Sequence, residues 1–280
     1  DPGVWTHFCD LPSPRAYFAS SFHNNKIYIA GGKIVNPEND EVETTNTALY
    51  VDLQSKTCHE IPPMQEFRSK CTSFILNDLF YVFGGNSNLP GEKFGEVYDI
   101  QQRSWRFLPS IPLLVTFPCV VTDNKFVYVI GQHNNKGWLQ IYDLKTETWS
   151  KSYETPEWLT IDRYGFGCYA EKRIFFTFDV SKMFIYDIES KRWRFEFNHV
   201  SLRKEYQLIR INNHLVMCGG QYTSYEKYIS KSISVFHIPS WNSYRQDDSF
   251  ILPFAVKGHS MVKNSPKGKV SKFVTKTLVL

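Results

Sequence analysis

The residues best suited to chemistry in this chain are six cysteines and eight histidines, which could bind a metal ion or take part in nucleophilic and proton-transfer steps. No two cysteines form a CxxC pair, and no histidine completes a zinc-binding spacing. The sequence also contains no nucleophile elbow, phosphate-binding loop or paired-carboxylate motif. We therefore predict that the chain is not an enzyme and that it uses no cofactor and no metal ion.

The cysteines indicate a buried structural role in a reducing compartment. Four of them recur about once per repeat unit, on apolar segments that we expect to be strands: Cys71, Cys119, Cys168 and Cys218. The chain has no Asn-x-Ser/Thr glycosylation site, and no apolar run approaches the roughly 20 residues that span a bilayer. These features predict a cytoplasmic protein without a membrane segment. Because the chain begins at Asp1 without a methionine or a signal-peptide pattern, we expect it to be part of a longer protein.

The composition predicts a folded, β-rich chain, since 42% of the residues are hydrophobic and 16% are aromatic. The formal net charge is +4, but six lysines and no acidic residue follow Ser249. Leaving out those six of the 32 basic residues gives 26 basic against 28 acidic residues. A nucleic-acid-binding domain should carry a basic face on its folded body, so we predict no nucleic-acid partner.

A repeat with a nearly fixed period organises the chain. The second half of each repeat unit is a Tyr-Asp-apolar or similar triplet, with a Trp expected six residues after the Asp. Cys58 takes the place of this Trp in the first copy, and a degraded fifth copy covers residues 236–241. Four copies are clear, and their Asp residues are spaced 47, 44 and 44 residues apart: Asp52, Asp99, Asp143 and Asp187.

The first half of each unit consists of a strand, a polar turn and an apolar strand that ends in Gly-Gly. The turns, such as residues 24–26, predict tight hairpins. We expect the Gly-Gly pair where neighbouring backbone leaves no room for a Cβ atom. We expect the Asp to bond to the following backbone amides, and the Trp to fill the space between adjacent units. Clear Gly-Gly copies end at residues 32, 85 and 220, whereas residues 127–132 keep one glycine and residues 174–179 keep neither.

This set of motifs resembles the Kelch repeat, and the resemblance covers nearly the whole chain. Kelch domains are β-propellers with four-stranded blades around a central channel. The resemblance implies an all-β, six-bladed Kelch propeller in a single domain, residues 1–280, similar to the C-terminal Kelch domain of BTB-BACK-Kelch proteins. The blades are expected at about residues 13–62, 66–110, 115–152, 160–197 and 202–244, with a sixth from 253–280 and 3–8.

The sixth blade is expected to be a composite and irregular closing blade. Trp5 lies 53 residues before Cys58, so it occupies the Trp position of a preceding blade and belongs to its outer strand. Residues 255–262 and 270–280 would supply the inner strands. Either the blade is incomplete, or residues upstream of Asp1 supply its third strand.

Four arginines share one repeat position, at the start of inner strands: Arg15, Arg68, Arg163 and Arg203. In the Kelch adaptors that this chain resembles, arginines at this position line the channel mouth and bind acidic peptides, a task that suits the planar guanidinium fork. The alternative interpretation is that they are exposed turn residues bonding to local carbonyl groups. Blade three departs from the pattern, with Val115, Thr116 and Phe117 at this position.

The loops after the Gly-Gly pair form a second candidate set. Residues 33–47 are long and acidic but lack the spaced ligands of a calcium loop. Residues 221–231 carry three tyrosines, which suit a binding hot spot or could fold back onto their own blade. The two sets together give the predicted partner-binding residues: Arg15, Tyr17, Lys33, Arg68, Lys70, Asn86, His133, Trp138, Arg163, Tyr164, Arg203, Gln221, Tyr222 and Tyr225.

The resemblance implies a protein-interaction domain that recruits a substrate protein or peptide at its loop rim. It would be the substrate-recognition module of a BTB-Kelch adaptor for a cullin-RING E3 ubiquitin ligase, with the cullin bound only through domains outside this chain. The alternative is an actin- or cytoskeleton-binding Kelch protein, which the lysine-rich residues 263–280 would favour. Some Kelch-like rings are copper oxidases, but the histidines here show no spacing that pairs them for that site.

Overall fold

The computed structural model describes residues 8–36, 41–85, 94–162, 165–178, 182–197, 203–204, 207–211, 214–218, 221–222, 232–237 and 244–251, with side chains up to residue 195. Every regular element in these ranges is a β-strand, which confirms the all-β fold class. No helix in the described ranges is long and apolar enough to cross a membrane. The chain divides into two compact units, which we describe separately.

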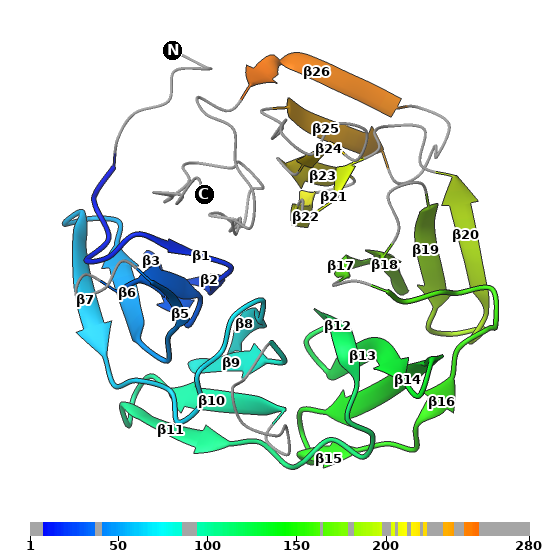
Figure 1. Ribbon diagram of the computed structural model, residues 1–280, viewed down its shortest axis with the longest axis horizontal. Coiled ribbons are helices and arrows are strands. Elements are labelled where there is room, and N and C mark those ends of the chain that lie inside the picture. The colour runs from blue at the N-terminus through cyan, green and yellow to red at the C-terminus, as the bar shows by residue number, and fades with distance from the viewer. Residues whose placement is uncertain are drawn as a thin grey trace. The chain divides into compact units, whose positions relative to one another are not determined.

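Unit 2 comprises His7–Leu114, Thr146–Trp149 and His259–Leu280. Its first four-stranded antiparallel sheet has the order β2 (Ala19–His23), β3 (Lys26–Ala30), β6 (Ala48–Asp52) and β7 (Thr57–Ile61) (Figure 1). The second has the order β8 (Thr72–Leu76), β9 (Leu79–Phe83), β10 (Gly95–Asp99) and β11 (Ser104–Phe107). A small sheet joins β1 (Arg15–Ala16), β4 (Lys33–Val35) and β5 (Val42–Thr44), and strand β15 (Thr148–Trp149) also belongs to this unit.

Unit 1 comprises Asp1–Thr6, Val115–Lys145 and Ser150–Gly258. In its first sheet β12 (Thr116–Thr122), β13 (Phe126–His133) and β14 (Lys136–Asp143) are neighbours, and β16 (Tyr153–Glu154) pairs with β14. The next sheet has the order β17 (Phe166–Ala170), β18 (Arg173–Thr177), β19 (Lys182–Asp187) and β20 (Trp193–Phe197). The last has the order β22 (Gln207–Ile211), β23 (His214–Cys218), β25 (Ser232–His237) and β26 (Tyr244–Ile251), beside the short pair β21 (Arg203–Lys204) and β24 (Gln221–Tyr222).

Within each unit the first strands of successive sheets lie against one another. Strand β2 contacts β8 in unit 2, and β17 contacts both β12 and β22 in unit 1. This contact places each sheet as one blade beside the next within its unit. The predicted composite sixth blade lies outside the described residues, so its closure stays a prediction.

The turns form as the sequence predicts. Asn24 and Asn25 join β2 to β3 with φ of 45° and 59°, the left-handed pair that a tight hairpin requires. At the next hairpin, the carboxylate of Asp52 accepts hydrogen bonds from the amides of Gln54 and Ser55 at 2.8 and 3.1 Å. Amides two or three residues later donate in the same way to the other three repeat acids: Asp99, Asp143 and Asp187.

The Gly-Gly pair follows β3 where the chain passes close to two links, the one that leads into its own blade and the one that leads into the next blade. Gly31 and Gly32 have φ of 64° and 102°, which side-chain-bearing residues rarely adopt. A Cβ atom on Gly32 would lie 2.7 Å from the carbonyl oxygen of Ala16, and one on Gly31 would overlap that of Arg68. The predicted reason for this pair is therefore confirmed.

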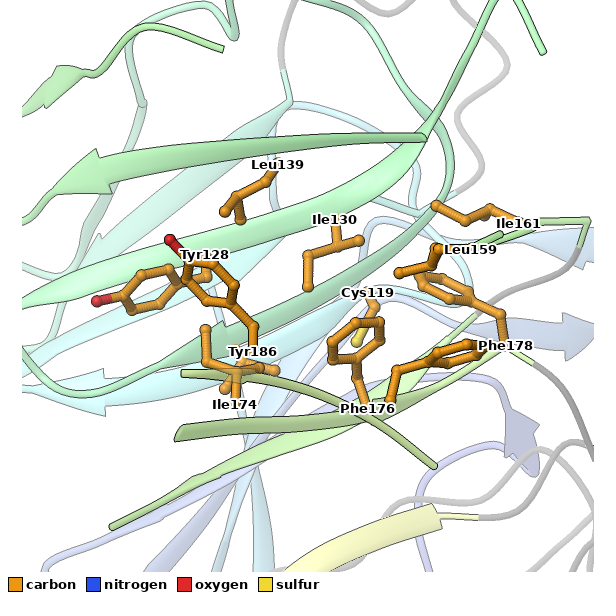
Figure 2. Close-up of a cluster of buried hydrophobic side chains, with 12 residues drawn as sticks. Cys119, Tyr128, Ile130, Leu139, Leu159, Ile161, Ile174, Phe176, Phe178 and Tyr186 are labelled. Atoms are coloured by element: carbon orange, nitrogen blue, oxygen red, sulfur yellow. The ribbon is translucent and has the colours of Figure 1, made fainter. Parts of the chain in front are cut away.

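The hydrophobic core lies between neighbouring sheets. In unit 1, Tyr128 and Ile130 from β13 pack against Ile174 and Phe176 from β18, with Cys119 among them (Figure 2). In unit 2 a corresponding cluster joins β3 to β9. The repeat Trp residues close the space between blades, as predicted. The Trp105 indole N–H, for example, donates to the carbonyl oxygen of Pro62 at 2.6 Å, in the link after β7.

Candidate partner-binding site

Two arginines at the repeat position have described side chains, and both are buried inside their blades. Arg15 is 3% exposed and Arg68 is 2% exposed. Nη1 of Arg15 donates to the carbonyl oxygen of Gly31 at 3.2 Å, and Nη1 of Arg68 donates to that of Gly84 at 3.1 Å. In both cases the arginine contacts a glycine carbonyl 16 residues later, at the first glycine of its own blade's Gly-Gly pair.

This geometry corrects the expectation for Arg15 and Arg68. Both sequence interpretations assumed exposed guanidinium groups, and that assumption is wrong for these two residues. The bonds to local carbonyl groups match the second interpretation, so the two arginines position the chain at the start of the inner strand. Burial lowers the pKa of Arg15 from its usual value, while the nearby charge of Glu60 opposes that shift.

A buried carboxylate that sequence reasoning missed completes the Arg68 site. Glu96 in β10 is 0% exposed, and its Oε1 accepts a hydrogen bond from Nε of Arg68 at 3.1 Å. The same carboxylate accepts the amide N–H groups of Gln65 and Glu66 at 2.7 and 3.1 Å. One buried charge thus fixes residues 65–68, the link between the first two blades. In the sequence, the sign of this buried carboxylate is an acidic residue, Glu96, three positions before Asp99 in a strand that is otherwise buried up to Tyr98.

The link residues next to these anchors are exposed. Phe67 is 45% exposed and Leu114 is 49% exposed. They occupy equivalent repeat positions, immediately before Arg68 and before Val115, which takes the place of the arginine in blade three. Sequence reasoning missed both, because they share only their apolar character and not a residue type.

Tyr17 and Lys70 also hold equivalent positions, two residues after Arg15 and Arg68. Both have left-handed backbone conformations, with φ of 56° and 59°. The Lys70 amide donates to the carbonyl oxygen of Tyr17 at 2.7 Å, and its Nζ lies 5.2 Å from the centre of the Tyr17 ring. The structure therefore brings these two predicted residues together, half-buried, in unit 2. We refer to Tyr17, Phe67, Lys70 and Leu114 as the link surface.

The strands after Gly-Gly pair with the link segments, which joins the two predicted loop sets. In the small sheet of unit 2, Ala16 on β1 pairs with Lys33 on β4. In unit 1, Arg203 pairs with Tyr222 and Lys204 with Gln221, between β21 and β24. The same arrangement thus recurs in the first and fifth blades.

The third blade departs from the predicted loop. His133 ends β13 and Trp138 lies in β14, so both belong to one long hairpin rather than to a binding loop. Trp138 is half-buried, and its indole N–H has no acceptor among the described residues. Four predicted site residues lie outside the described residues: Asn86, Arg163, Tyr164 and Tyr225.

No three His, Cys, Asp or Glu residues of the described part of the chain gather into a group that could hold a metal ion. The described site is instead a set of anchored backbone links with exposed apolar side chains and a half-buried lysine. Such a surface suits contact with another macromolecule.

Comparison with known proteins agrees with this fold. The model of the Kelch motif matches residues 14–65. The solved structure of YjhT, a Kelch propeller, superposes with a TM-score of 0.71 at 14% identity and covers 88% of each chain, which shows the fold alone. The protein is thus an all-β protein of the Kelch propeller class.

Two curated relatives define the family further. The Kelch repeat and BTB domain-containing protein 2 of cowpox virus (strain GRI-90 / Grishak) is 26% identical over 43% of this chain and 21% of its own length. The human Kelch-like protein 23 is 30% identical over 40% of this chain and 18% of its own length. These matches support a Kelch-repeat family for this chain, which covers about a fifth of the length of these relatives. Kelch-repeat domains bind protein partners.

Proposed function

We propose that this chain is the substrate-recognition module of a BTB-Kelch adaptor, which recruits a substrate protein to a cullin-RING ubiquitin ligase in the cytoplasm. The names of the viral relatives combine Kelch repeats with a BTB domain, which supports this class of protein. The described cysteines are free thiols, in keeping with a reducing compartment. The cullin would bind through domains outside this chain.

The observation that carries the proposal is the pairing of rigid anchors with exposed side chains on the link surface. The buried Arg68–Glu96 pair fixes the link, and Phe67 beside it is nearly half exposed. A fixed, exposed aromatic residue loses little conformational entropy when a partner covers it, which is typical of a binding hot spot. The half-buried Lys70 adds a cation at the same surface, and we keep Tyr17 and Lys33 as further contacts.

The first experiment tests partner capture by the link surface. The double variant Phe67→Asp, Leu114→Asp should lose at least about tenfold of the proteins that the wild-type chain captures from cell extract, because each Asp places a charge at the contact. Tyr153→Asp is the matched control, since Tyr153 is 46% exposed and lies on β16 in the other unit. Equal capture by wild type and the double variant, both with unchanged melting temperature, would place the partner site elsewhere.

The second experiment tests the ligase connection with the full-length protein. Cullin should co-purify with the full-length protein and not with the chain alone, and captured partners should be ubiquitinated in its presence. Full-length protein without bound cullin would refute the adaptor role while leaving partner binding intact. Co-sedimentation with actin filaments, lost on removal of residues 263–280, would favour the cytoskeletal alternative.

A further inference from the structure

Two cysteines lie side by side where the repeat loses its tryptophan. Cys58 in β7 occupies the position that holds Trp105 in the next blade, and Cys9 lies in the segment that precedes the first blade. Their Sγ atoms are 3.9 Å apart, although the residues are 49 positions apart in the chain. Both are half-buried free thiols, so a small reagent can reach them.

The surrounding core holds the two thiols in place. Leu11 is buried against Val51 in the cluster that also contains Phe18, and Cys9 and Cys58 pack at its edge. The Cys58 thiol donates to the carbonyl oxygen of Asp10 at 3.1 Å, which ties the segment to β7 through the residue next to Cys9. The contact thus joins two packed parts of unit 2.

We propose that Cys9 and Cys58 are a redox-active thiol pair that closes into an intramolecular disulfide when a small-molecule disulfide, such as oxidised glutathione, is available. The Cys58 thiolate attacks one sulfur of the reagent, which forms a mixed disulfide and releases one thiolate. The Cys9 thiolate then attacks the Cys58 sulfur and releases the second thiolate. Two protein thiols are oxidised and one reagent disulfide is reduced to two thiols, which take up the two protons that the protein thiols lose.

The electrostatics favour Cys58 as the attacking group. Burial raises the pKa of both thiols, and the neighbouring Cys58 contributes to raising that of Cys9 to about 11. A hydrogen bond from Cys9 and the positive charge of Arg15 oppose the rise for Cys58, whereas Asp10 adds to it. We take Cys58 as the attacking thiolate, because two neighbouring groups oppose the rise of its pKa and none opposes that of Cys9.

A metal-binding role is less well supported by the same atoms. No third His, Cys, Asp or Glu residue joins the pair within the described ranges of the chain. A stable zinc site takes four ligands, so two thiols alone fit covalent pairing better. The disulfide would join the segment before the first blade to the outer strand of that blade, and would lock the two together when the surroundings become oxidising.

The experiment equilibrates the protein with mixtures of reduced and oxidised glutathione and then traps free thiols with an alkylating reagent. Tryptic mapping should find the peptide that ends at Arg15 linked to the peptide of residues 57–68, two hydrogens lighter than their sum. The melting temperature should rise by about 5 °C on oxidation and return with reductant.

Cysteine variants distinguish the Cys9–Cys58 disulfide from other oxidation products of the protein. Cys9→Ser and Cys58→Ser should abolish the linked peptide and the rise in melting temperature. In the Cys9→Ser variant, the reaction should instead end with Cys58 in a mixed disulfide with glutathione, because the second thiol is missing. Cys71→Ala, which removes a different thiol, should keep both signals. Wild-type protein that carries only separate glutathione adducts, with no linked peptide at any mixture, would overturn the proposal.

Discussion

Arg68→Met would remove one partner of the buried ion pair with Glu96 and leave the carboxylate in the interior. The lost contacts include the bond from Nε to Glu96 Oε1 at 3.1 Å and those from Nη1 to the carbonyl oxygens of Gly84 at 3.1 Å and Phe94 at 3.4 Å. Removing one partner of a buried pair costs about 3–5 kcal/mol. Because the amides of Gln65 and Glu66 still donate to the carboxylate, we expect the lower end, about 3 kcal/mol.

A second variant removes the negative charge of the pair instead of the positive one. Glu96→Gln leaves Arg68 buried beside a neutral acceptor and should cost about 2 kcal/mol. The double variant leaves no isolated charge, so its cost should fall at least about 1 kcal/mol below the sum of the two single costs. Arg106→Met is the control, because it breaks the exposed ion pair with Glu147 and should change stability by less than about 1 kcal/mol.

Urea unfolding followed by tryptophan fluorescence measures these differences from the transition midpoints at a common slope. If Arg68→Met costs no more than Arg106→Met, the buried pair does not hold the link between the blades. Strict additivity of the two single variants would also refute the reasoning, since it would mean that the two charges do not act on each other.

Three further predictions concern the repeat itself. Gly32→Ala should destabilise the fold by about 2–4 kcal/mol, because its φ is 102° and the new Cβ would lie 2.7 Å from the carbonyl oxygen of Ala16; urea midpoints check this. Trp105→Phe should cost about 1 kcal/mol, since it removes the hydrogen bond to the carbonyl oxygen of Pro62, measured in the same way. The amide and the hydroxyl group of Ser190, in the hairpin that follows, donate hydrogen bonds that lower the pKa of Asp187 to about 2. Its charge therefore stabilises the fold above about pH 4, and this contribution is lost as the pH falls towards 2. The stability gap between wild type and Asp187→Asn should thus be constant from pH 5 to 7 and narrow below pH 4.

The repeat residues were readable from sequence because each acts on its near neighbours. Asp52 caps the hairpin that follows it, and Asn24 and Asn25 form a turn on their own. Such local roles need the same residue type in every blade, so they appear as a period. Gly32 follows the same rule, since its close approach is to Ala16 in the link of its own blade.

The arginines show where the period misleads. Their shared repeat position predicts a shared role in binding a partner. Arg15 and Arg68 do share a role, but it is structural: each donates a hydrogen bond to a glycine carbonyl oxygen of its own blade. The repeat position alone shows neither that Arg15 and Arg68 are both buried nor that only Arg68 has an acidic partner. Glu96 lies 28 residues from Arg68 and has no counterpart at the equivalent Leu49 in the first blade. Nothing in a repeat pattern reports such a pair.

In a repeat fold the residues that serve a structural role common to every blade recur, whereas residues that serve a particular partner or reaction have no reason to recur. Phe67 and Leu114 differ in type although they share an exposed position, and Cys58 interrupts the Trp series where its sulfur lies 3.9 Å from that of Cys9. Departures from the period are therefore better guides to function than the period itself. The same reasoning predicts that restoring Cys58→Trp would remove the thiol pair while leaving the link surface, which lies in other segments, able to bind its partner.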